Sequence, residues 1–198
     1  MLQFYIMTTR EIYEKIKFVS QDELNSLDMS TERDTTTKMT VFALYYEYPA
    51  GREHYRLLKY ISKLFQGEKL FDIGTNNGVS AIALSNEKSN HIHSYDVVYF
   101  HETALINESN ITFYVENVLD KPEVLNETRF IMLDTDHDGK FENIFYDHLI
   151  SSGYKGILFC DDIHLNPQME SFWNRITHEK VDLTSIGHNT GSGLVIFE

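Results

Sequence analysis

The sequence is poor in cysteine and proline and has no long hydrophobic run. Cys160 is the only cysteine among 198 residues, which excludes an internal disulfide and favours a reducing, intracellular setting, most simply the cytoplasm. The first residues, MLQFYIMTTR, lack the apolar stretch of a signal peptide, and no stretch approaches the roughly 18 apolar residues of a membrane span. With 3 prolines and 42% hydrophobic residues, the composition is that of an ordinary folded domain. We therefore expect a folded protein that is not a membrane protein.

Basic side chains are also scarce. Lys and Arg total 17 against 30 Asp and Glu, which gives a formal net charge of -13, and no dense run of basic residues breaks this excess. Because proteins bind long nucleic acids mainly by neutralising phosphates with Lys and Arg, a nucleic-acid partner is not expected. The sequence leaves the oligomeric state open, a homodimer included.

The N-terminal part differs in pattern from the rest of the chain. Thr8 and Ser20 each stand three residues before a glutamate, as in the capping box that begins a helix, and the polar connection STERDTTTK follows. We expect residues 1–49 to form an N-terminal helical extension or lid and residues 50–198 to form one domain. The first helix of that domain should carry Tyr55, Leu58, Ile61 and Phe65 on one face and stop near Gly67.

An aromatic segment, VFALYYEYPAGREHY, joins these two parts. It contains Phe42, Tyr45, Tyr46, Tyr48 and Tyr55. Tyrosine offers a flat apolar surface with a polar tip, which would suit a lid over an aromatic or sugar substrate. Ordinary packing against the domain is the simpler interpretation and is favoured here.

Strand and helix patterns alternate after this segment. Strands are predicted for the apolar runs KLFDI, HIHSYDVV, ITFYV, RFIML and GILFC. Helices are predicted for VSAIALS, for NPQMESFWNRIT with Asn166 as its cap, and for KFENIFYDHLISSG with an apolar face of Phe141, Ile144, Phe145 and Leu149. Two last strands, VDLTSIG and GLVIFE, flank the turn-like HNTGS. These patterns predict an α/β fold: a Rossmann-like, doubly wound, mostly parallel seven-stranded sheet with a C-terminal antiparallel strand pair.

The segment FDIGTNNGVSA falls at the first turn from strand to helix. Gly74 and Gly78 allow a sharp turn and the close approach of a ligand, and the helix start offers free N–H groups to an anion. The spacing is neither the GxGxxG of dinucleotide-binding proteins nor a P-loop. Asp96, at the end of the second strand, is suited to accept hydrogen bonds from ribose hydroxyls. A nucleotide-like ligand is expected, although the same glycines would also serve a turn without a ligand.

FDIGTNNG followed by YDVV resembles the cofactor half of class I S-adenosylmethionine-dependent methyltransferases, and the resemblance covers roughly Ala50 to Glu198. It implies S-adenosylmethionine as the cofactor, with the loop around its methionine end and Asp96 on its ribose. Adenine would be contacted from the end of the third strand, by Asn117 in preference to Asp120. The cofactor-binding residues implied in this way are Asp72, Gly74, Thr75, Asn76, Gly78, Asp96 and Asn117.

The segment LDTDHDG begins like a calcium-binding EF-hand loop. With Asp134 in the first position, the twelfth is Phe145 instead of the required glutamate, and a strand precedes the segment instead of a helix. Asp134 ends one predicted strand, and Asp161 and Asp162 end the next, so a strand-helix-strand crossover would bring the three carboxylates together. They would repel one another unless they bind a proton, a cationic group or a metal, and hard oxygen ligands suit Mg²⁺. Capping of loops and helices is the alternative.

LDTDHDG followed by LFCDDI also resembles the cation-dependent small-molecule O-methyltransferases of the catechol and macrocin types. The resemblance implies a Mg²⁺ site of Asp134, Asp161 and Asp162, with Asp136 as a competitor for the first place. Catechol-type enzymes place a lysine general base where this sequence has His137, and a histidine suits the same task. A structural histidine bonded to the backbone is an equal alternative. His164 could line the same pocket, but a place in a surface loop is favoured.

These observations lead to three functional hypotheses. The main one is an O-methyltransferase that transfers the methyl group of S-adenosylmethionine to a hydroxylated small molecule, assisted by a divalent metal, with Asp134 and His137 as the catalytic residues. A nucleotide-dependent oxidoreductase on a similar sheet is the second, against which the missing GxGxxG counts. The third is a cofactor-binding protein that has lost its chemistry and acts through a partner.

Overall fold

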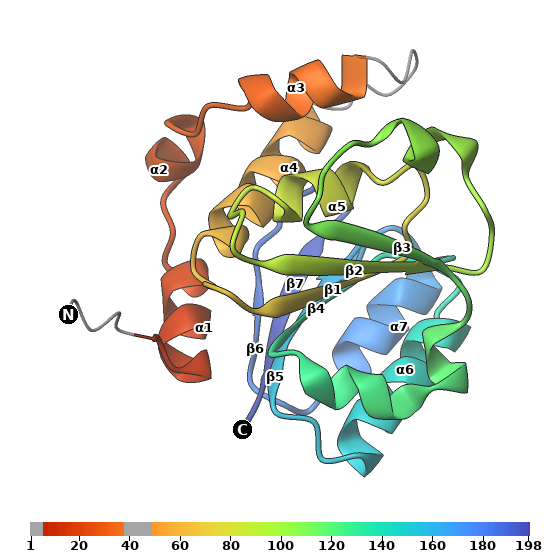
Figure 1. Cartoon of the computed structure of the whole chain (residues 1–198). Coiled ribbons are helices and arrows are strands. Elements are labelled where there is room, and N and C mark those ends of the chain that lie inside the picture. Colours follow the sequence, from red (N-terminus) through yellow and green to blue (C-terminus); the bar gives the residue numbers. More distant parts are fainter. Residues whose placement is uncertain (1–5, 38–48) are drawn as a thin grey trace.

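The computed structural model describes residues 6–37 and 49–198. Within these ranges seven strands form one sheet, in the order β3-β2-β1-β4-β5-β7-β6 (Figure 1). The strands are β1 (Lys69–Ile73), β2 (His91–Asp96), β3 (Ile111–Val115), β4 (Phe130–Leu133), β5 (Gly156–Asp161), β6 (Lys180–Asp182) and β7 (Ser192–Phe197). β1 to β5 pair in parallel, whereas β7 runs antiparallel to both β5 and β6. The predicted mostly parallel sheet with its C-terminal antiparallel pair is confirmed.

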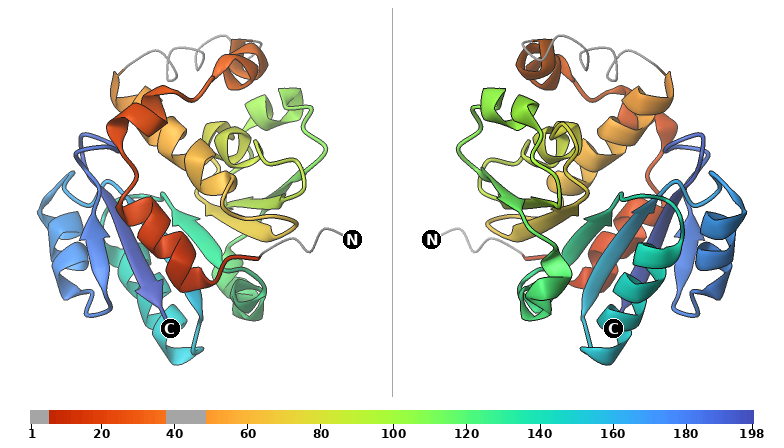
Figure 2. Two further views of the ribbon diagram at one scale, coloured as in Figure 1. Left: turned by 90° about the vertical axis from the view of Figure 1, so that its left-hand side faces the viewer. Right: turned by 90° about the vertical axis from the view of Figure 1, so that its right-hand side faces the viewer.

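Helices cover both faces of the sheet, as the two views of Figure 2 show. One layer contains α1 (Thr9–Lys17), α4 (Pro49–Ser62) and α5 (Val79–Leu84), and the other contains α6 (Lys140–Ser151) and α7 (Pro167–Arg175). Side chains along a strand alternate between the two faces, so Leu70 joins the core of the first layer and Phe71 that of the second. The connections before and after β3 consist of short 3-10 helices and loops, with η2 (His101–Leu105), η3 (Val118–Asp120) and η4 (Pro122–Glu127).

The N-terminal residues pack onto this domain. The expected capping box is present at Thr8, and the Ser20 side chain caps α2 (Gln21–Asn25). Ile12 and Ile16 of α1 are buried in the same core as the sheet, so α1 is part of the packed structure. The lid part of the prediction depends on Phe42, Tyr45, Tyr46 and Tyr48, which lie outside the described residues.

The stretch STERDTTTK, expected to be a connection, is helical instead. Of these residues, Ser30–Thr37 form α3. Glu32 of α3 is buried and pairs with the buried Lys59 of α4, with 2.7 Å between Oε1 and Nζ. Lys59 also donates to the backbone carbonyl of Asp28. Since these contacts cross between segments distant in sequence, a polar pattern alone did not predict the helix.

Three other local predictions differ from the structure. Ile144 is 59% exposed, because the buried face of α6 runs through Glu142, Phe145, Tyr146 and Leu149. The helix with Tyr55 and Leu58 ends at Ser62, before the buried Phe65. The strand predicted for VDLTSIG ends at Asp182, whose carboxylate accepts the Thr184 backbone N–H at 2.9 Å and so begins a turn.

The carboxyl ends of neighbouring strands are fixed to one another by main-chain contacts. The Gly74 N–H donates to the Tyr95 carbonyl at 2.9 Å, and the Asp134 N–H donates to the Ile73 carbonyl at 2.8 Å. Gly74 has a φ of 102°, and a Cβ atom there would lie 1.5 Å from the Asp134 carbonyl oxygen. Only glycine fits this position, which places the glycine loop directly against the end of β4.

Within residues 6–37 and 49–198, no helix combines the length and the apolar character that crossing a bilayer requires.

Candidate active site

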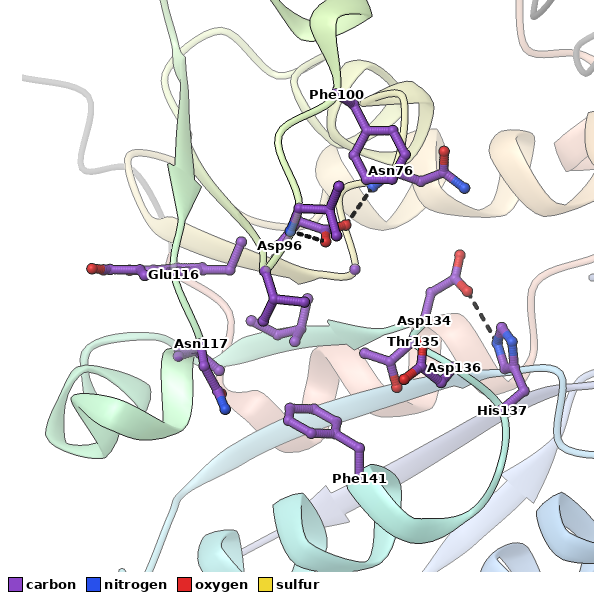
Figure 3. A pocket seen from close by; sticks show the side chains of 16 residues that line it. Asn76, Asp96, Phe100, Glu116, Asn117, Asp134, Thr135, Asp136, His137 and Phe141 are labelled. Carbon is purple, nitrogen blue, oxygen red and sulfur yellow. Dashed lines mark hydrogen bonds and ion pairs between the residues drawn. The ribbon is translucent and has the colours of Figure 1, made fainter.

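A cavity of about 400 Å³ opens at the carboxyl ends of β1 to β4 (Figure 3). The glycine loop, the end of β2 and the end of β3 form one part of its wall, and the segment after β4 with Phe141 of α6 forms the rest. Its lining includes four of the seven predicted cofactor-binding residues, which are Gly74, Asn76, Asp96 and Asn117. Its size falls within the range of small-molecule sites, roughly 300–1,000 Å³.

Asp96 holds the glycine loop in place. Its Oδ2 accepts the backbone N–H of Asn76 at 2.9 Å, and its Oδ1 accepts that of Val98 at 2.9 Å (Figure 3). Asn76 is in the left-handed region with a φ of 44°, which asparagine tolerates better than most residues. Each carboxylate oxygen has a second lone pair for a ligand hydroxyl, so Asp96 can both fix the loop and bind ribose.

Asn117 and Phe141 lie on the opposite side of the cavity from Asn76 in Figure 3. The Asn117 side-chain oxygen accepts the Leu119 backbone N–H at 3.0 Å and caps η3. Its amide NH₂ group is therefore the part that can read the edge of a base. Tyr95 and Val97 add apolar surface to the lining, whereas Asp120, the less favoured candidate for this contact, does not line the cavity.

The other three predicted cofactor residues do not line the cavity. Asp72 is fully buried, and its Oδ2 accepts the Ser94 hydroxyl at 2.6 Å. That hydroxyl oxygen lies 2.7 Å from the hydroxyl oxygen of Thr75. A Cβ atom on Gly78 would come within 2.6 Å of the Ile106 side chain. These contacts of Asp72, Thr75 and Gly78 fix the conformation of the glycine loop. A direct cofactor contact by any of the three stays a prediction.

The three predicted metal ligands meet at the ends of β4 and β5. We call Asp134, Asp161 and Asp162 the acidic cluster. His137 joins it, since its Nε2 lies 3.1 Å from Asp134 Oδ1 and 3.6 Å from Asp162 Oδ2. The β4-α6-β5 crossover thus brings distant carboxylates together as the sequence predicts, and Asp134 and His137 also line the cavity.

Two further histidines approach the acidic cluster and were missed from the sequence. His54 of α4 places Nδ1 3.5 Å from Asp161 Oδ1. His188, in the loop between β6 and β7, places Nδ1 3.0 Å from Asp162 Oδ1 and 3.7 Å from Asp161 Oδ1. The Thr190 hydroxyl donates to Asp162 as well. No local signal marks these histidines, because only the folded arrangement of α4 and the β6-β7 loop brings them to the cluster.

Comparison with known proteins places the fold. No family model matches the sequence, and no curated protein matches it. An O-methyltransferase from Bacillus cereus in complex with S-adenosylhomocysteine (SAH) is 15% identical, with a TM-score of 0.60 over 94% of this chain and 100% of that chain. Methyltransferases from Podospora anserina and Geobacter sulfurreducens are 10% and 11% identical, with TM-scores of 0.59 and 0.58. The match with the Podospora anserina protein covers 100% of this chain, and that with the Geobacter sulfurreducens protein covers 98% of it. Each match covers 100% of the other chain. The chain has the class I methyltransferase fold.

Burial and neighbouring charges shift the pKa values of the groups in and around the acidic cluster. Burial, together with the charges of Asp134 and Asp162, raises the pKa of Asp161 well above its usual value. Burial lowers the pKa of His54 to about 4, so His54 and Asp161 do not form an ion pair at neutral pH. Burial therefore disfavours a charge on both Asp161 and His54.

The outer groups of the cluster shift in the opposite sense. Burial works against charge on Asp162, but hydrogen bonds from His188 and Thr190 lower its pKa below the ordinary value. Burial also opposes a charge on His137, but the neighbouring carboxylates of Asp134 and Asp162 outweigh it and raise the pKa of His137.

The donor atoms of the cluster fit a divalent cation. Asp161 Oδ1 and His54 Nδ1 are buried and have no hydrogen-bond partner, and His137 Nε2 lies 3.1 Å from Asp134 Oδ1. Asp134, His137 and Asp161 each offer one ligand atom, and these atoms lie within 4.8 Å of one another. Converging, unsatisfied donors of this kind are what a cation would satisfy.

The remaining candidates near LDTDHDG have other positions. Asp136 lines the cavity. The Asp138 carboxylate accepts the Lys140 backbone N–H at 2.8 Å, at the turn that leads into α6. His164 pairs with Asp182 at 2.7 Å, is partly exposed and does not line the cavity, in line with the favoured interpretation as a surface residue.

Proposed function

We propose that this protein transfers the methyl group of S-adenosylmethionine to a hydroxyl of a small molecule, with a divalent cation at the acidic cluster. The observation that carries the proposal is that the cavity and the cluster share Asp134 and His137. A cofactor in the cavity would end beside the groups that hold the acceptor. The solved methyltransferases of the same fold, two of them in complex with SAH, support the cofactor half of the proposal.

The cofactor half follows from the lining of the cavity. S-adenosylmethionine supplies an electrophilic methyl group. Asp96 would accept hydrogen bonds from the ribose hydroxyls while it holds the Asn76 N–H. Asn117 would bind the adenine edge, and Phe141 offers an apolar surface to the adenine face. The glycine loop would enclose the methionine end, next to Asp134.

The acceptor half follows from the acidic cluster. A divalent cation, Mg²⁺ in the simplest case, supplies positive charge that lowers the pKa of an acceptor hydroxyl. Asp134, Asp161 and Asp162 would hold it; Asp161 is common to the two groups of converging ligand atoms, which are Asp134–His137–Asp161 and Asp161–Asp162–His188. His137 stands beside Asp134 at the cavity wall. A cation would offset the carboxylates that raise the pKa of His137, and its imidazole in the neutral form could then accept the proton of the acceptor hydroxyl. Most of the rate acceleration would come from alignment of the acceptor oxygen with the methyl group.

Calorimetric titration with SAH tests the cofactor half. Wild-type protein should bind SAH, and Asp96→Ala should weaken binding by about 10- to 100-fold, since hydrogen bonds to a charged group contribute roughly 1.5–3 kcal/mol. Asp120→Ala is the matched control, because Asp120 is exposed and does not line the cavity. Absence of SAH binding to the wild-type protein, or an equal loss in both variants, would refute the assignment.

Turnover tests the acceptor half. With a panel of catechols, sugars and other hydroxylated acceptors, Asp161→Asn should lose cation-dependent methylation while its SAH affinity stays within about threefold of wild type, because Asp161 does not line the cavity. Full activity of this variant would show that the carboxylates are structural. SAH binding without turnover on any acceptor would favour a protein that binds the cofactor and has lost its chemistry.

A further inference from the structure

His54 is a buried histidine with one ring nitrogen that its packing does not explain. The residue is 4% exposed, and its Nδ1 has no hydrogen-bond partner. Around the ring lie Tyr55, Phe159 and His188, at centroid distances of 5.0, 6.0 and 5.6 Å. A phenylalanine ring could make the same aromatic contacts. Because buried polar atoms in proteins almost always have a partner, we expect Nδ1 of His54 to have one as well.

The nearest candidate partners of this nitrogen are in the acidic cluster. His54 Nδ1 lies 3.5 Å from Asp161 Oδ1, which is also buried and has no hydrogen-bond partner. That distance exceeds the roughly 2.7–3.2 Å of an N–H···O hydrogen bond. Two donors bound to one ion at about 2.0–2.2 Å each are separated by roughly 2.8–4.4 Å. The separation therefore fits two ligands of a shared cation better than a direct hydrogen bond.

His188 differs from His54 in this respect. Its Nδ1 is already within hydrogen-bond distance of Asp162, at 3.0 Å, and of the Thr190 hydroxyl, at 2.6 Å. Its contacts orient the Asp162 carboxylate. Of the two Nδ1 atoms, only that of His54 has no hydrogen-bond partner.

We propose that His54 is a nitrogen ligand of the cation, and that the site therefore selects a first-row transition-metal ion, such as Mn²⁺, Fe²⁺ or Co²⁺, over Mg²⁺. This inference rests on the proposed function, in which the acidic cluster holds the cation. Mg²⁺ takes oxygen ligands and keeps several waters, whereas imidazole suits transition metals. An imidazole nitrogen 3.5 Å from Asp161 gives a mixed nitrogen and oxygen set, so the carboxylate-only set expected from the sequence lacks one ligand.

Pulsed electron paramagnetic resonance of the Mn²⁺-loaded wild-type protein tests this without a substitution. Protein with ¹⁴N-histidine should show a hyperfine coupling to a bound imidazole nitrogen, and protein with ¹⁵N-histidine should show the corresponding ¹⁵N pattern. In His54→Phe, which keeps the aromatic contacts, this coupling should disappear. Co²⁺ affinity should then fall at least roughly tenfold, while Mg²⁺ affinity changes less than about threefold, because only the transition metal gains from the nitrogen.

His93→Phe is the matched control. His93 also packs against aromatic rings, with centroids 5.4 Å from Phe71 and 5.5 Å from Tyr114, but unlike His54 it has no ion pair with a carboxylate of the acidic cluster among the described residues. It should leave the nitrogen coupling and both metal affinities unchanged. Wild-type protein without a nitrogen coupling, or a coupling that persists in folded His54→Phe, would overturn the proposal.

The outcome is separable from that of the proposed function. SAH titration does not depend on His54, which lies outside the cavity lining. SAH binding together with an absent nitrogen coupling would overturn only the His54 assignment. A nitrogen coupling in a protein that fails to bind SAH would overturn the methyltransferase proposal and leave the metal site standing.

Discussion

Replacing Asp72 by asparagine should make the stability of the protein less dependent on pH. Asp72 is fully buried at the start of the glycine loop, and one of its carboxylate oxygens accepts the Ser94 hydroxyl. Burial raises its pKa to about 7, although the hydroxyls of Ser94 and Ser80 partly offset this. The folded protein therefore keeps Asp72 protonated under conditions in which the unfolded chain has already released the proton.

The magnitude follows from this pKa difference. The pKa rises from 3.8 to about 7, and each unit corresponds to about 1.4 kcal/mol, so ionisation of Asp72 costs the folded state about 4 kcal/mol in total. Below pH 3.8 both states carry the proton and no cost arises. As pH rises from there towards 7, stability is progressively lost, and above 7 the loss is complete. Between pH 5 and pH 8 the change amounts to about 3 kcal/mol.

Urea unfolding at pH 5 and pH 8 measures this effect. An asparagine side chain cannot ionise, so the stability of Asp72→Asn relative to wild type should rise by about 3 kcal/mol from the lower to the higher pH. Taking the difference between the two proteins cancels every other titrating group. Asp120→Asn, at an exposed position, should show no such change. Equal effects of Asp72→Asn at both pH values would refute the reasoning and favour an ionised Asp72.

Two further substitutions test close contacts. Gly74→Ala should lower the free energy of unfolding by roughly 3 kcal/mol or more beyond the effect of Gly153→Ala. Both glycines have a positive φ, but only at Gly74 would the new Cβ meet backbone, 1.5 Å from the Asp134 carbonyl oxygen. Similar urea midpoints would contradict this. Lys59→Met should cost roughly 3–5 kcal/mol by removing the positive charge 2.7 Å from buried Glu32, and the double variant with Glu32→Leu should recover most of the loss in thermal melts. A double variant no more stable than Lys59→Met would contradict the pairing.

The strands and the glycine loop could be predicted because their causes are local. KLFDI and ITFYV are β1 and β3 residue for residue, since a short apolar run bounded by polar residues leaves little choice of register. The meeting of Asp134 with Asp161 could also be predicted, because a parallel crossover always brings the ends of its two strands to the same edge. Local pattern and one general rule of connection were enough for these.

The rest depends on contacts between distant segments. His54 and His188 reach the acidic cluster from α4 and from the loop before β7, and nothing near either residue in the sequence indicates this. α3 was missed because its polar sequence is accommodated by the buried pair of Glu32 and Lys59. The separation of Asp72 and Thr75 from the cavity lining likewise depends on which way each side chain points.

The contact between Gly74 and the Asp134 carbonyl has a consequence for how precisely the two halves of the site are spaced. Backbone meets backbone there, so no rotamer change lies between the glycine loop and the end of β4. The spacing should therefore vary little with temperature, whereas one added carbon atom would alter it. A misplacement of two reactants by about 1 Å can cost roughly 100-fold in rate. A transfer between two separately held reactants therefore requires that the distance between the two halves of the site vary by less than the size of a methyl group.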